Sequence, residues 1–486
     1  MKKLLLVSSL LFFVFTVTAQ QHIQKSKLTV EFNPNIATYS IVERLMAAKD
    51  GRFFYIDGKA DDSYLPMVHL AFTKMQQFDN KKILQQFGEY IQITGLQQDL
   101  TYHALLRANT FPAKGFKYSF DGLKTDSVKL AAVKKFTEQL RLFFIERKLE
   151  QFFKTNKRFI NGAINEVRKN IPPGYELKLE KYYGEEISGY KFYVNPFDDI
   201  PYDTTFWHGN GPKIKTPQGW IANMISSAYL PLAKENNINQ YNHFGFDHPA
   251  TVNLLVTHEY GHSFVNPLLE PFEKQINESA DLKYAGLNEA MENQAYGYWP
   301  TCITEHIVRL GEIRIAATNG NKPLADSLRK LHTVTYSFAL LPFFEKKIIE
   351  YENNRDKYPS LKDFIPQLLT VLKSITADDV RKQMGLTTEK FTVTINLKVP
   401  AGSGDVYITG NQMQMGNWDP KKVKLNYVSE DSRSITFTSY ADLRFKFTKG
   451  SWETEGNVTN HEKGKDISQL LTKNDTLNFE ITGWNQ

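Results

Sequence analysis

The stretch His258-Glu259-Tyr260-Gly261-His262 decides the fold expected of this chain, because it places two imidazoles and a carboxylate on one short segment. Side chains four residues apart lie on the same face of a helix, so both imidazoles can reach one Zn²⁺ at about 2.0 to 2.1 Å. Glu259 then stands beside a water whose pKa zinc lowers towards about 7, and it can accept the proton of that water. The stretch predicts the zinc helix of a hydrolase, with His258 and His262 as ligands and Glu259 as the base.

The residues around the motif predict a buried helix. Pro249 stands near its first turn, the apolar residues Val252, Leu255 and Val256 lead into the motif, and Pro267 closes the segment. The alternative is a pair of ordinary histidines on a helix surface. The apolar context favours the metal site.

A catalytic zinc site needs a third protein ligand, and the identity of that ligand sorts these enzymes into families. The metzincin spacing is absent, because Val265 and Leu268 stand where that pattern requires Gly and His. A downstream carboxylate remains. Residues 301–318 predict a helix on which Glu305 and Arg309 lie one turn apart. We expect Glu305 to be the third ligand, oriented by Arg309.

Other side chains are alternatives for the third ligand, because spacing alone does not decide among them. Glu289 lies in the sequence Leu-Asn-Glu-Ala, which looks like the Asn-Glu pair of aminopeptidase-like gluzincins. Glu292, Glu312 and His306 are the remaining alternatives. For each of these residues the simpler explanation is a solvated charge on a helix.

Two tyrosines in the segment AYGYW, Tyr296 and Tyr298, are candidates to hydrogen-bond the oxyanion of the reaction. An aromatic pair beside Trp299 also fits plain packing. A catalytic role for either tyrosine therefore stays a hypothesis at this point.

Taken together, HEYGH and a downstream glutamate resemble a gluzincin metallopeptidase. More narrowly, HEYGHSFVNP, AYGYW and EHIVRL are similar to a family of bacterial proteins known as a domain of unknown function. The resemblance spans most of residues 20–353. It implies a zinc-peptidase-like fold with His258, His262 and Glu305 as ligands and Glu259 as base, and it implies no substrate.

The first 19 residues have the layout of a cleaved secretory signal, with a basic start, an apolar run over residues 4–15 and small residues ending at Ala19. We expect the mature chain to begin at Gln20 and to be exported to the periplasm, the cell surface or the medium. No later stretch approaches the roughly 20 apolar residues that a bilayer requires, so we expect no membrane span. Cys302 is the only cysteine, so no intramolecular disulfide can form.

The charge of the chain is moderate, since 59 basic and 53 acidic residues give a formal net charge of +6. The two signs are interspersed along the sequence. This distribution is typical of a solvated surface and argues against nucleic acid as a partner.

Before the metal helices, residues 21–169 are predicted to be mostly helical, with one long helix over residues 128–153. Alternating apolar and charged residues predict strands over 175–183 and 190–194, which would form a small sheet beside the metal helices. Edge strands of such sheets pair with extended substrates in zinc peptidases. One of these two strands is therefore a candidate to do so here.

A long loop over residues 201–219, rich in Gly, Pro, Asp and Thr, is expected to rim a cleft. His208 in this loop, and His243 and His248 after it, are further candidate site residues, although isolated histidines in loops are mostly incidental. Helices return over residues 323–384.

From residue 391 the hydrophobic period changes to two, with segments such as FTVTINLKV and LNFEITGW separated by turn residues. This pattern predicts a β-sandwich over residues 388–486. The motifs VYITG, GNWDP, FKF and SWE resemble the family-20 carbohydrate-binding module, the starch-binding domain of glucoamylases.

The resemblance implies a sugar site in which two tryptophans stack on glucose rings and polar side chains contact the hydroxyls: Trp418, Trp452, Lys446, Glu453 and Asn457. Exposed indoles suit this role because they offer flat apolar faces to the C–H faces of a sugar ring. The alternative for either tryptophan alone is core packing. Residues 421–439 are shorter than in the module family and lack its extra aromatic, so we do not expect a second sugar site.

The sequence therefore predicts a multidomain chain. A mainly helical α+β region of zincin-like metallopeptidase type, residues 20–385 with metal helices at about 249–318, precedes an all-β sandwich. The function that fits best is an exported zinc metallopeptidase that acts on a peptide or protein substrate and is targeted to starch-like glycans or glycoproteins. One alternative is a glycan-binding protein with a vestigial or structural metal site. The other is a zinc hydrolase that acts on the carbohydrate or its acyl decorations.

Overall fold

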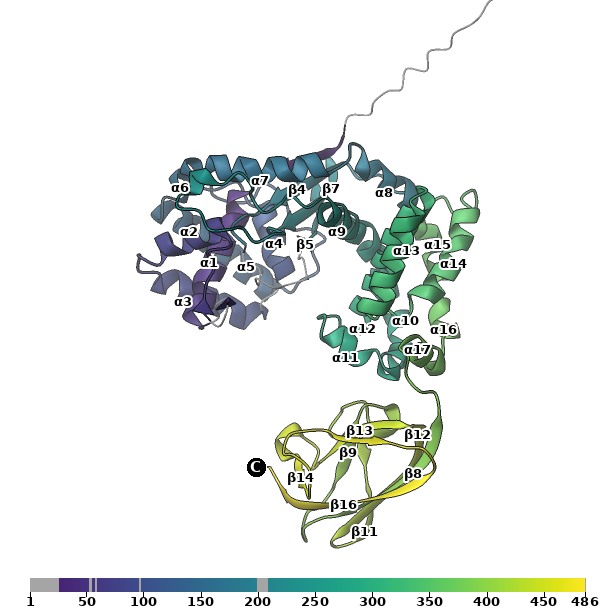
Figure 1. The fold of residues 1–486 in the computed structure, drawn as a ribbon. Helices are drawn as coiled ribbons and strands as arrows, with labels where there is room; N and C mark the ends of the chain where they lie inside the picture. The colour runs from purple at the N-terminus through teal and green to yellow at the C-terminus, as the bar shows by residue number, and fades with distance from the viewer. Residues whose placement is uncertain (1–25, 52–54, 57–58, 96–97, 199–208, 486) are drawn as a thin grey trace, which may run out of the picture.

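The protein consists of a helical part followed by a β-domain (Figure 1). The computed structural model describes residues 26–51, 55–56, 59–95, 98–198 and 209–485. The predicted order, a helical α+β region followed by an all-β domain, is confirmed. The predicted signal segment and His208 lie outside the described residues. Within the described part of the chain, no helix combines the length and the apolar character needed to cross a membrane.

Helices that share an aromatic core form the N-terminal part: α1 (Pro34–Lys49), α2 (Pro66–Met75), α3 (Lys81–Thr94), α4 (Gln98–Arg107), α5 (Ser127–Glu146), α6 (Leu149–Thr155) and α7 (Lys157–Asn170). Phe136 of α5 stacks on Phe87 and Tyr90 of α3, with ring centroids 5.1 and 4.6 Å apart. Tyr39 of α1 meets Phe87 edge-on at 6.0 Å. These rings join three helices into one core. A short hairpin pairs β2 (Tyr55–Ile56) with β3 (Lys59–Ala60).

The long helix predicted over residues 128–153 is two helices, α5 and α6. Asp126 caps α5, since its side chain accepts a hydrogen bond from Lys129 N. The chain turns at Lys148, whose φ of 51° lies in the left-handed region and cannot continue a helix. Buried apolar residues occur on both sides of this turn. A prediction from apolar periodicity alone therefore joined the two helices into one.

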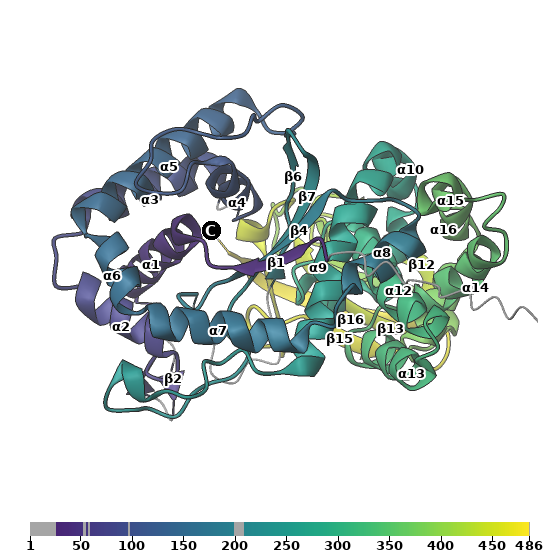
Figure 2. The ribbon, with the colours of Figure 1, turned by 90° about the horizontal axis from the view of Figure 1, so that it is seen from above.

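A small mixed sheet lies between the N-terminal helices and the metal helices (Figures 1 and 2). Its strand order is β1-β4-β7-β5, and β6 also pairs with β7. The first three strands are parallel, whereas β5 and β6 run antiparallel to β7. The strands are β1 (Leu28–Glu31), β4 (Gly189–Val194), β5 (Gly209–Asn210), β6 (Lys213–Thr216) and β7 (Gly219–Ser226).

The strand predicted over residues 175–183 is wrong, because this segment is helix α8 (Tyr175–Tyr183). Two of the charged residues counted as solvent-facing are buried: Glu176 accepts a hydrogen bond from Lys27 N at 2.8 Å, and Glu180 accepts one from Tyr190 OH at 3.1 Å. When Glu176 and Glu180 are counted as buried, the buried positions 176, 179, 180 and 183 recur at the spacing of a helix. The strand predicted over 190–194 is confirmed as β4, but it lies between β1 and β7 and has no free edge for a substrate.

Helices α9 (Pro249–Leu269) and α12 (Trp299–Thr318) pack against each other and carry the metal motif and the predicted third ligand. His248 caps α9 by accepting a hydrogen bond from Thr251 N at 3.2 Å. Pro267 does not close α9 as predicted, because the helix continues to Leu269. The other helices around this pair are α10 (Glu273–Asn277), α11 (Asn288–Glu292), α13 (Lys322–Lys330), α14 (Leu341–Asn353), α15 (Leu361–Leu368), α16 (Val371–Ser374) and α17 (Ala377–Gln383).

The C-terminal domain contains two antiparallel-dominated sheets that face each other over an apolar core. One sheet has the order β10-β9-β13-β15 and the other β11-β12-β8-β16-β14. Phe445 and Phe447 of β13 point into the core with Phe479 of β16, at ring distances of 5.5 and 5.8 Å. The strands are β8 (Lys390–Lys398), β9 (Tyr407–Gly410), β10 (Val423–Lys424), β11 (Asn426–Ser429), β12 (Ser432–Tyr440), β13 (Asp442–Thr448), β14 (Gly456–Val458), β15 (Ile467–Leu470) and β16 (Asp475–Trp484).

Ion pairs connect this β-domain to the helical part. Arg381 of α17, which is 1% exposed, pairs with Asp442 of β13. Arg444 Nη2 of the same strand lies 2.8 Å from Glu289 Oε2 of α11. The β-domain is therefore docked on α11 and α17.

Candidate metal centre

The two motif histidines face each other on α9. Their Nε2 atoms are 3.3 Å apart, and each Nδ1 has a partner on the other side of its ring. His258 Nδ1 donates to Glu312 Oε1 at 2.8 Å, and His262 Nδ1 is 3.0 Å from Asn266 Oδ1. These outer contacts fix the ring orientations and direct both Nε2 atoms to the same point.

Glu305 of α12 reaches the same point. Its Oε1 lies 3.3 Å from His262 Nε2, and its Oε2 lies 3.6 Å from His258 Nε2. Glu305 is 5% exposed, and within the described structure its Oε2 has no hydrogen-bond partner. Arg309, one turn along α12, lies 3.6 Å from this oxygen. A buried carboxylate oxygen without a hydrogen-bond partner is rare in folded proteins, and a bound water or ion is one way to satisfy it.

The spacing of these atoms fits a tetrahedral metal ion. Ligand atoms about 2.0 to 2.1 Å from such an ion lie about 3.3 to 3.4 Å from one another. Two of the three distances, from His262 Nε2 to His258 Nε2 and to Glu305 Oε1, are 3.3 Å. His258, His262 and Glu305 therefore form a donor set that could hold a divalent cation.

The other candidates for the third ligand are engaged elsewhere. Glu312 lies behind His258 and also accepts a hydrogen bond from His332 Nε2 at 2.8 Å. Glu289 binds Arg444 of the β-domain, and Glu292 Oε1 lies 3.4 Å from Lys283 Nζ. His306 Nδ1 donates to the carbonyl of Cys302 at 2.7 Å.

The charges at the site are strongly coupled. Burial works to raise the pKa of Glu305, but the two imidazoles and Arg309 outweigh it and lower this pKa to about 2. Burial works to lower the pKa of His262, but Glu305 and Glu259 outweigh it and raise this pKa to about 9. A divalent cation bound here would replace the proton that such a pair otherwise shares.

Glu259 is buried beside the donor set, and its exposed fraction is 6%. Burial raises the pKa of its carboxyl, although His258 and His262 work in the opposite direction. A carboxylate whose pKa moves towards neutrality is a better general base. Strand β5 lies directly against it, since a Cβ placed on Gly209 would come within 2.4 Å of Glu259 Oε1. Any larger residue at position 209 would displace Glu259.

The two tyrosine candidates lie in different places. Tyr296 lines the metal cavity, and its hydroxyl is 3.4 Å from Arg309 Nη2. Burial and Glu305 raise the pKa of Tyr296 to about 12, so its hydroxyl keeps its proton at neutral pH. Tyr298 is 57% exposed, is outside the cavity lining, and donates its hydroxyl to Glu273. The structure therefore brings only Tyr296 to the cavity.

A cavity of about 1240 Å³ opens onto the donor set and contains residues that the sequence did not single out. His103 of α4 lines it, and burial together with Arg107 lowers the pKa of His103 to about 3. Arg107 Nη1 donates to His103 Nδ1 at 2.7 Å, so Nε2 carries the proton of the neutral ring. His103 is thus a neutral hydrogen-bond donor in the cavity. No local motif points to it, because α4 reaches the site only through tertiary packing.

Close packing of α9 on α12 positions the donor set. The hydroxyl of Tyr183 lies between Gly261 and Gly311, and a Cβ on Gly311 would come within 2.2 Å of it. Tyr183 stacks on Phe264 at 4.6 Å and is 2% exposed, so its ring has no room to move. The glycine within HEYGH therefore has a packing role between the metal helices.

The predicted sugar-binding residues divide into two groups. Trp418, Trp452 and Lys446 line a cavity of about 850 Å³ between the β-domain and α11. Lys446 Nζ also pairs with Glu455 Oε1 at 2.9 Å. Glu453 and Asn457 are outside the lining of this cavity.

The remaining histidine candidates do not approach the metal cavity. The side chain of His243 is 78% exposed, and its Nδ1 lies 3.9 Å from Glu166 Oε1. His248 serves as the N-cap of α9.

Comparisons with known proteins agree with this division of the chain. Residues 120–371 match the family described as a domain of unknown function (DUF4932). Residues 390–478 match the starch binding domain family. No curated protein matches the sequence.

Proposed function

Since the chain belongs to the DUF4932 family, a family of unknown function, we propose a function from the site itself: a zinc-dependent hydrolase, most naturally a peptidase. His258, His262 and Glu305 hold the ion, and Glu259 is the general base. The observation that carries the proposal is the convergence of two Nε2 atoms on a buried carboxylate whose Oε2 has no hydrogen-bond partner in the described structure.

The chain's own residues supply the remaining chemistry. When bound, zinc provides Lewis acidity that polarises a carbonyl and lowers the pKa of a water to about 7. Glu259 accepts a proton from the attacking water and returns it to the leaving amine. Tyr296 and His103 each keep a proton at neutral pH and line the cavity, so either can donate a hydrogen bond to the oxyanion.

Among the described residues, β5 and β6 pair only with β7, and their outer edge beside the cavity suits an extended substrate. Gly209, Gly211, Pro212 and Lys213 of the β5–β6 region line the metal cavity next to Glu259. An extended peptide along this edge would form backbone hydrogen bonds, as in β-strand addition. A peptide bond of a substrate along this edge would lie within reach of Glu259. This arrangement favours a peptide or protein substrate.

The match of residues 390–478 to the starch binding domain supports glycan targeting, and Trp418 and Trp452 are the residues proposed to hold the sugar. We expect the protein to act outside the cytoplasm on glycan-bearing material.

A second candidate is hydrolysis of an ester or amide on the glycan itself. Asn293 lines both the metal cavity and the cavity with the tryptophans, so the two are neighbours. This arrangement would bring a decoration of a bound sugar chain towards Glu259.

The test is hydrolysis of a peptide library and of acylated oligosaccharides by the wild type and by Glu259→Gln. The proposal predicts activity in the wild type and a loss of about 10²- to 10⁴-fold in Glu259→Gln with bound zinc retained. His243→Gln serves as the control, because this exposed histidine is outside the lining of the metal cavity. Equal activity of the wild type and Glu259→Gln would reject Glu259 as the base.

A further inference from the structure

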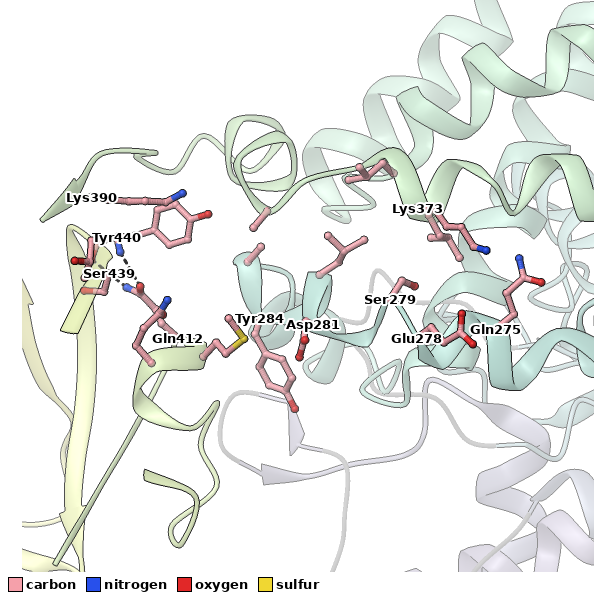
Figure 3. A pocket seen from close by; sticks show the side chains of 18 of the residues that line it. Gln275, Glu278, Ser279, Asp281, Tyr284, Lys373, Lys390, Gln412, Ser439 and Tyr440 are labelled. Atoms are coloured by element: carbon pink, nitrogen blue, oxygen red, sulfur yellow. Dashed lines mark hydrogen bonds between the residues drawn. The ribbon is translucent and has the colours of Figure 1, made fainter. Parts of the chain in front are cut away.

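Two cavities lie between the helical part and the β-domain. Figure 3 shows one of them, of about 630 Å³, with Tyr284 on the helical side and Gln412 and Tyr440 on the β-domain side. The other, of about 850 Å³, contains Trp418 and Trp452. Tyr284 lines both cavities. The second cavity has the size of a small-molecule site and walls from two domains.

The β-domain wall of this second cavity has the features of a sugar site. Trp452 is 44% exposed, and Trp418 is half-buried beside it. Asn417 and Trp418 both have left-handed backbones, with φ of 54° and 61°. Consecutive non-glycine residues in this region store strain, which is typical of ligand sites.

Unpartnered amides lie in the same cavity. Asn417 is 7% exposed, and neither its Oδ1 nor its Nδ2 has a hydrogen-bond partner in the described structure. On the opposite wall, the buried Oδ1 of Asn288 has no partner among the described residues either. Both residues line the cavity. Buried amides left in this way are explained by a ligand that both donates and accepts hydrogen bonds, as sugar hydroxyls do.

The walls of the cavity are held in place by contacts around it. Arg444 Nη2 pairs with Glu289 Oε2 at 2.8 Å, and both residues line the cavity. Arg381, also in the lining, pairs with Asp442. Tyr440 OH donates to Asp378 Oδ1 at 2.7 Å on the side of the other cavity. Contacts between the two domains therefore border both cavities.

We propose that one α-linked glucose chain binds between the two domains and not on the β-domain alone. Trp418 and Trp452 stack on the sugar rings, and Asn417 bonds their hydroxyls. Tyr284 and Asn288 of the helical part complete the site from the opposite wall. The inference rests on the glycan binding proposed above and extends it, because it gives the helical part a share in sugar recognition.

This placement bears on the substrate class. The residues after α11 lie between the cavity with Trp418 and Trp452, here called the sugar cavity, and the metal cavity. Asn293 belongs to the lining of both. A glucan chain seated on the tryptophans lies beside the metal cavity. A glycopeptide whose scissile peptide bond adjoins its glycan would therefore reach both cavities at once.

Calorimetric titration of the full-length protein with maltoheptaose tests the shared site. Trp452→Ala is expected to weaken binding at least tenfold. Tyr284→Ala and Asn288→Ala are each expected to weaken it about 3- to 10-fold, which is the loss of one aromatic or hydrogen-bonding contact of about 1 kcal/mol. Tyr298→Ala, which removes an exposed tyrosine of the helical part outside the cavity, is the matched control and should bind like the wild type.

Hydroxyl-radical footprinting of the wild-type protein gives a second measurement that needs no variant. Maltoheptaose should protect Tyr284 together with Trp452. If Trp452→Ala loses binding while Tyr284→Ala and Asn288→Ala match the wild type and Tyr284 is unprotected, the sugar binds to the β-domain alone and the shared site is wrong. If the wild type does not bind maltoheptaose, glycan binding itself is wrong. Neither outcome touches the metal site, because binding is measured without hydrolysis.

Discussion

At the residue scale, Glu312 supports the donor set through its hydrogen bond with His258. It is 2% exposed and joins His258 Nδ1 to His332 Nε2, with both hydrogen bonds at 2.8 Å. Burial works to raise the pKa of Glu312, but the two histidines outweigh it and hold this pKa well below its usual value. The carboxylate therefore stays charged behind His258, where it orients the imidazole and increases its basicity.

Replacing this carboxylate should weaken metal binding without removing a ligand. We expect Glu312→Gln to lower the zinc affinity about 10- to 100-fold, the range found for residues that support metal ligands. Competition with a chromogenic chelator measures the affinity. Glu292→Gln, an exposed glutamate that pairs with Lys283, is the control and should retain wild-type affinity. An unchanged affinity in Glu312→Gln would show that His258 does not need this support.

At the element scale, the crossing of α9 and α12 sets the distance between the histidines and Glu305. Gly311→Ala should force the two helices apart, because the new Cβ would lie 2.2 Å from the Tyr183 hydroxyl in a packed core. We expect a loss of about 1 to 3 kcal/mol in the free energy of unfolding, as in other overpacked cores, together with weaker zinc binding. Urea denaturation measures the first effect.

A glycine in an uncrowded helix provides the matched comparison. A Cβ on Gly88 of α3 would meet only Met46 Cε, at 3.7 Å. Gly88→Ala should therefore stabilise the protein by about 0.5 to 1 kcal/mol. If both variants have the same stability, the close approach at Gly311 is not what limits the packing of the metal helices.

The α12–α14 contact gives a pH-dependent prediction. Burial works to raise the pKa of Glu345, but hydrogen bonds from Arg329 and Arg314 outweigh it and lower this pKa below its usual value. A carboxyl group whose pKa is lower in the folded than in the unfolded state stabilises the fold at pH values above its unfolded-state pKa, near 4.3. This stabilisation is lost as the pH falls through the folded-state pKa. Glu345→Gln should lower the free energy of unfolding by about 2 kcal/mol at pH 7. This magnitude lies between the effect of breaking a surface ion pair and that of breaking a buried one.

The difference between wild type and Glu345→Gln should shrink as the pH falls below the usual glutamate pKa, and urea titrations at several pH values measure it. Glu350→Gln on the same helix is the control, because Glu350 is exposed and its ion pair with Lys347 lies at the surface. A difference that stays constant with pH would mean that Glu345 does not act through its charge.

The sequence could predict α9, α12 and the β-domain, because their periodicity and caps are local. It favoured Glu305 but could not exclude Glu289 or Glu312, since only the crossing of two helices brings one carboxylate to the histidines. Helix α8 was mistaken for a strand because Glu176 and Glu180 are buried by contacts with residues far along the chain. His103 was missed for the same reason.

At the scale of the whole molecule, the two domains are joined where their proposed sites adjoin. Glu289 was an alternative for the third metal ligand. It instead pairs with Arg444 and so connects the two domains at the cavity that contains Trp418 and Trp452. The single cysteine, Cys302, is buried, and burial raises the pKa of its thiol to about 12. The fold therefore depends on packing and ion pairs, with no intramolecular disulfide.

The metal content per chain tests the central claim most directly. Elemental mass spectrometry on zinc-replete wild type, His262→Ala, Glu305→Ala and the control His461→Ala, which removes an exposed histidine of the β-domain, should give close to one zinc in the wild type and the control, with clear loss in the other two variants. A wild-type protein without zinc, or a Glu305→Ala variant that retains it fully, would contradict the account.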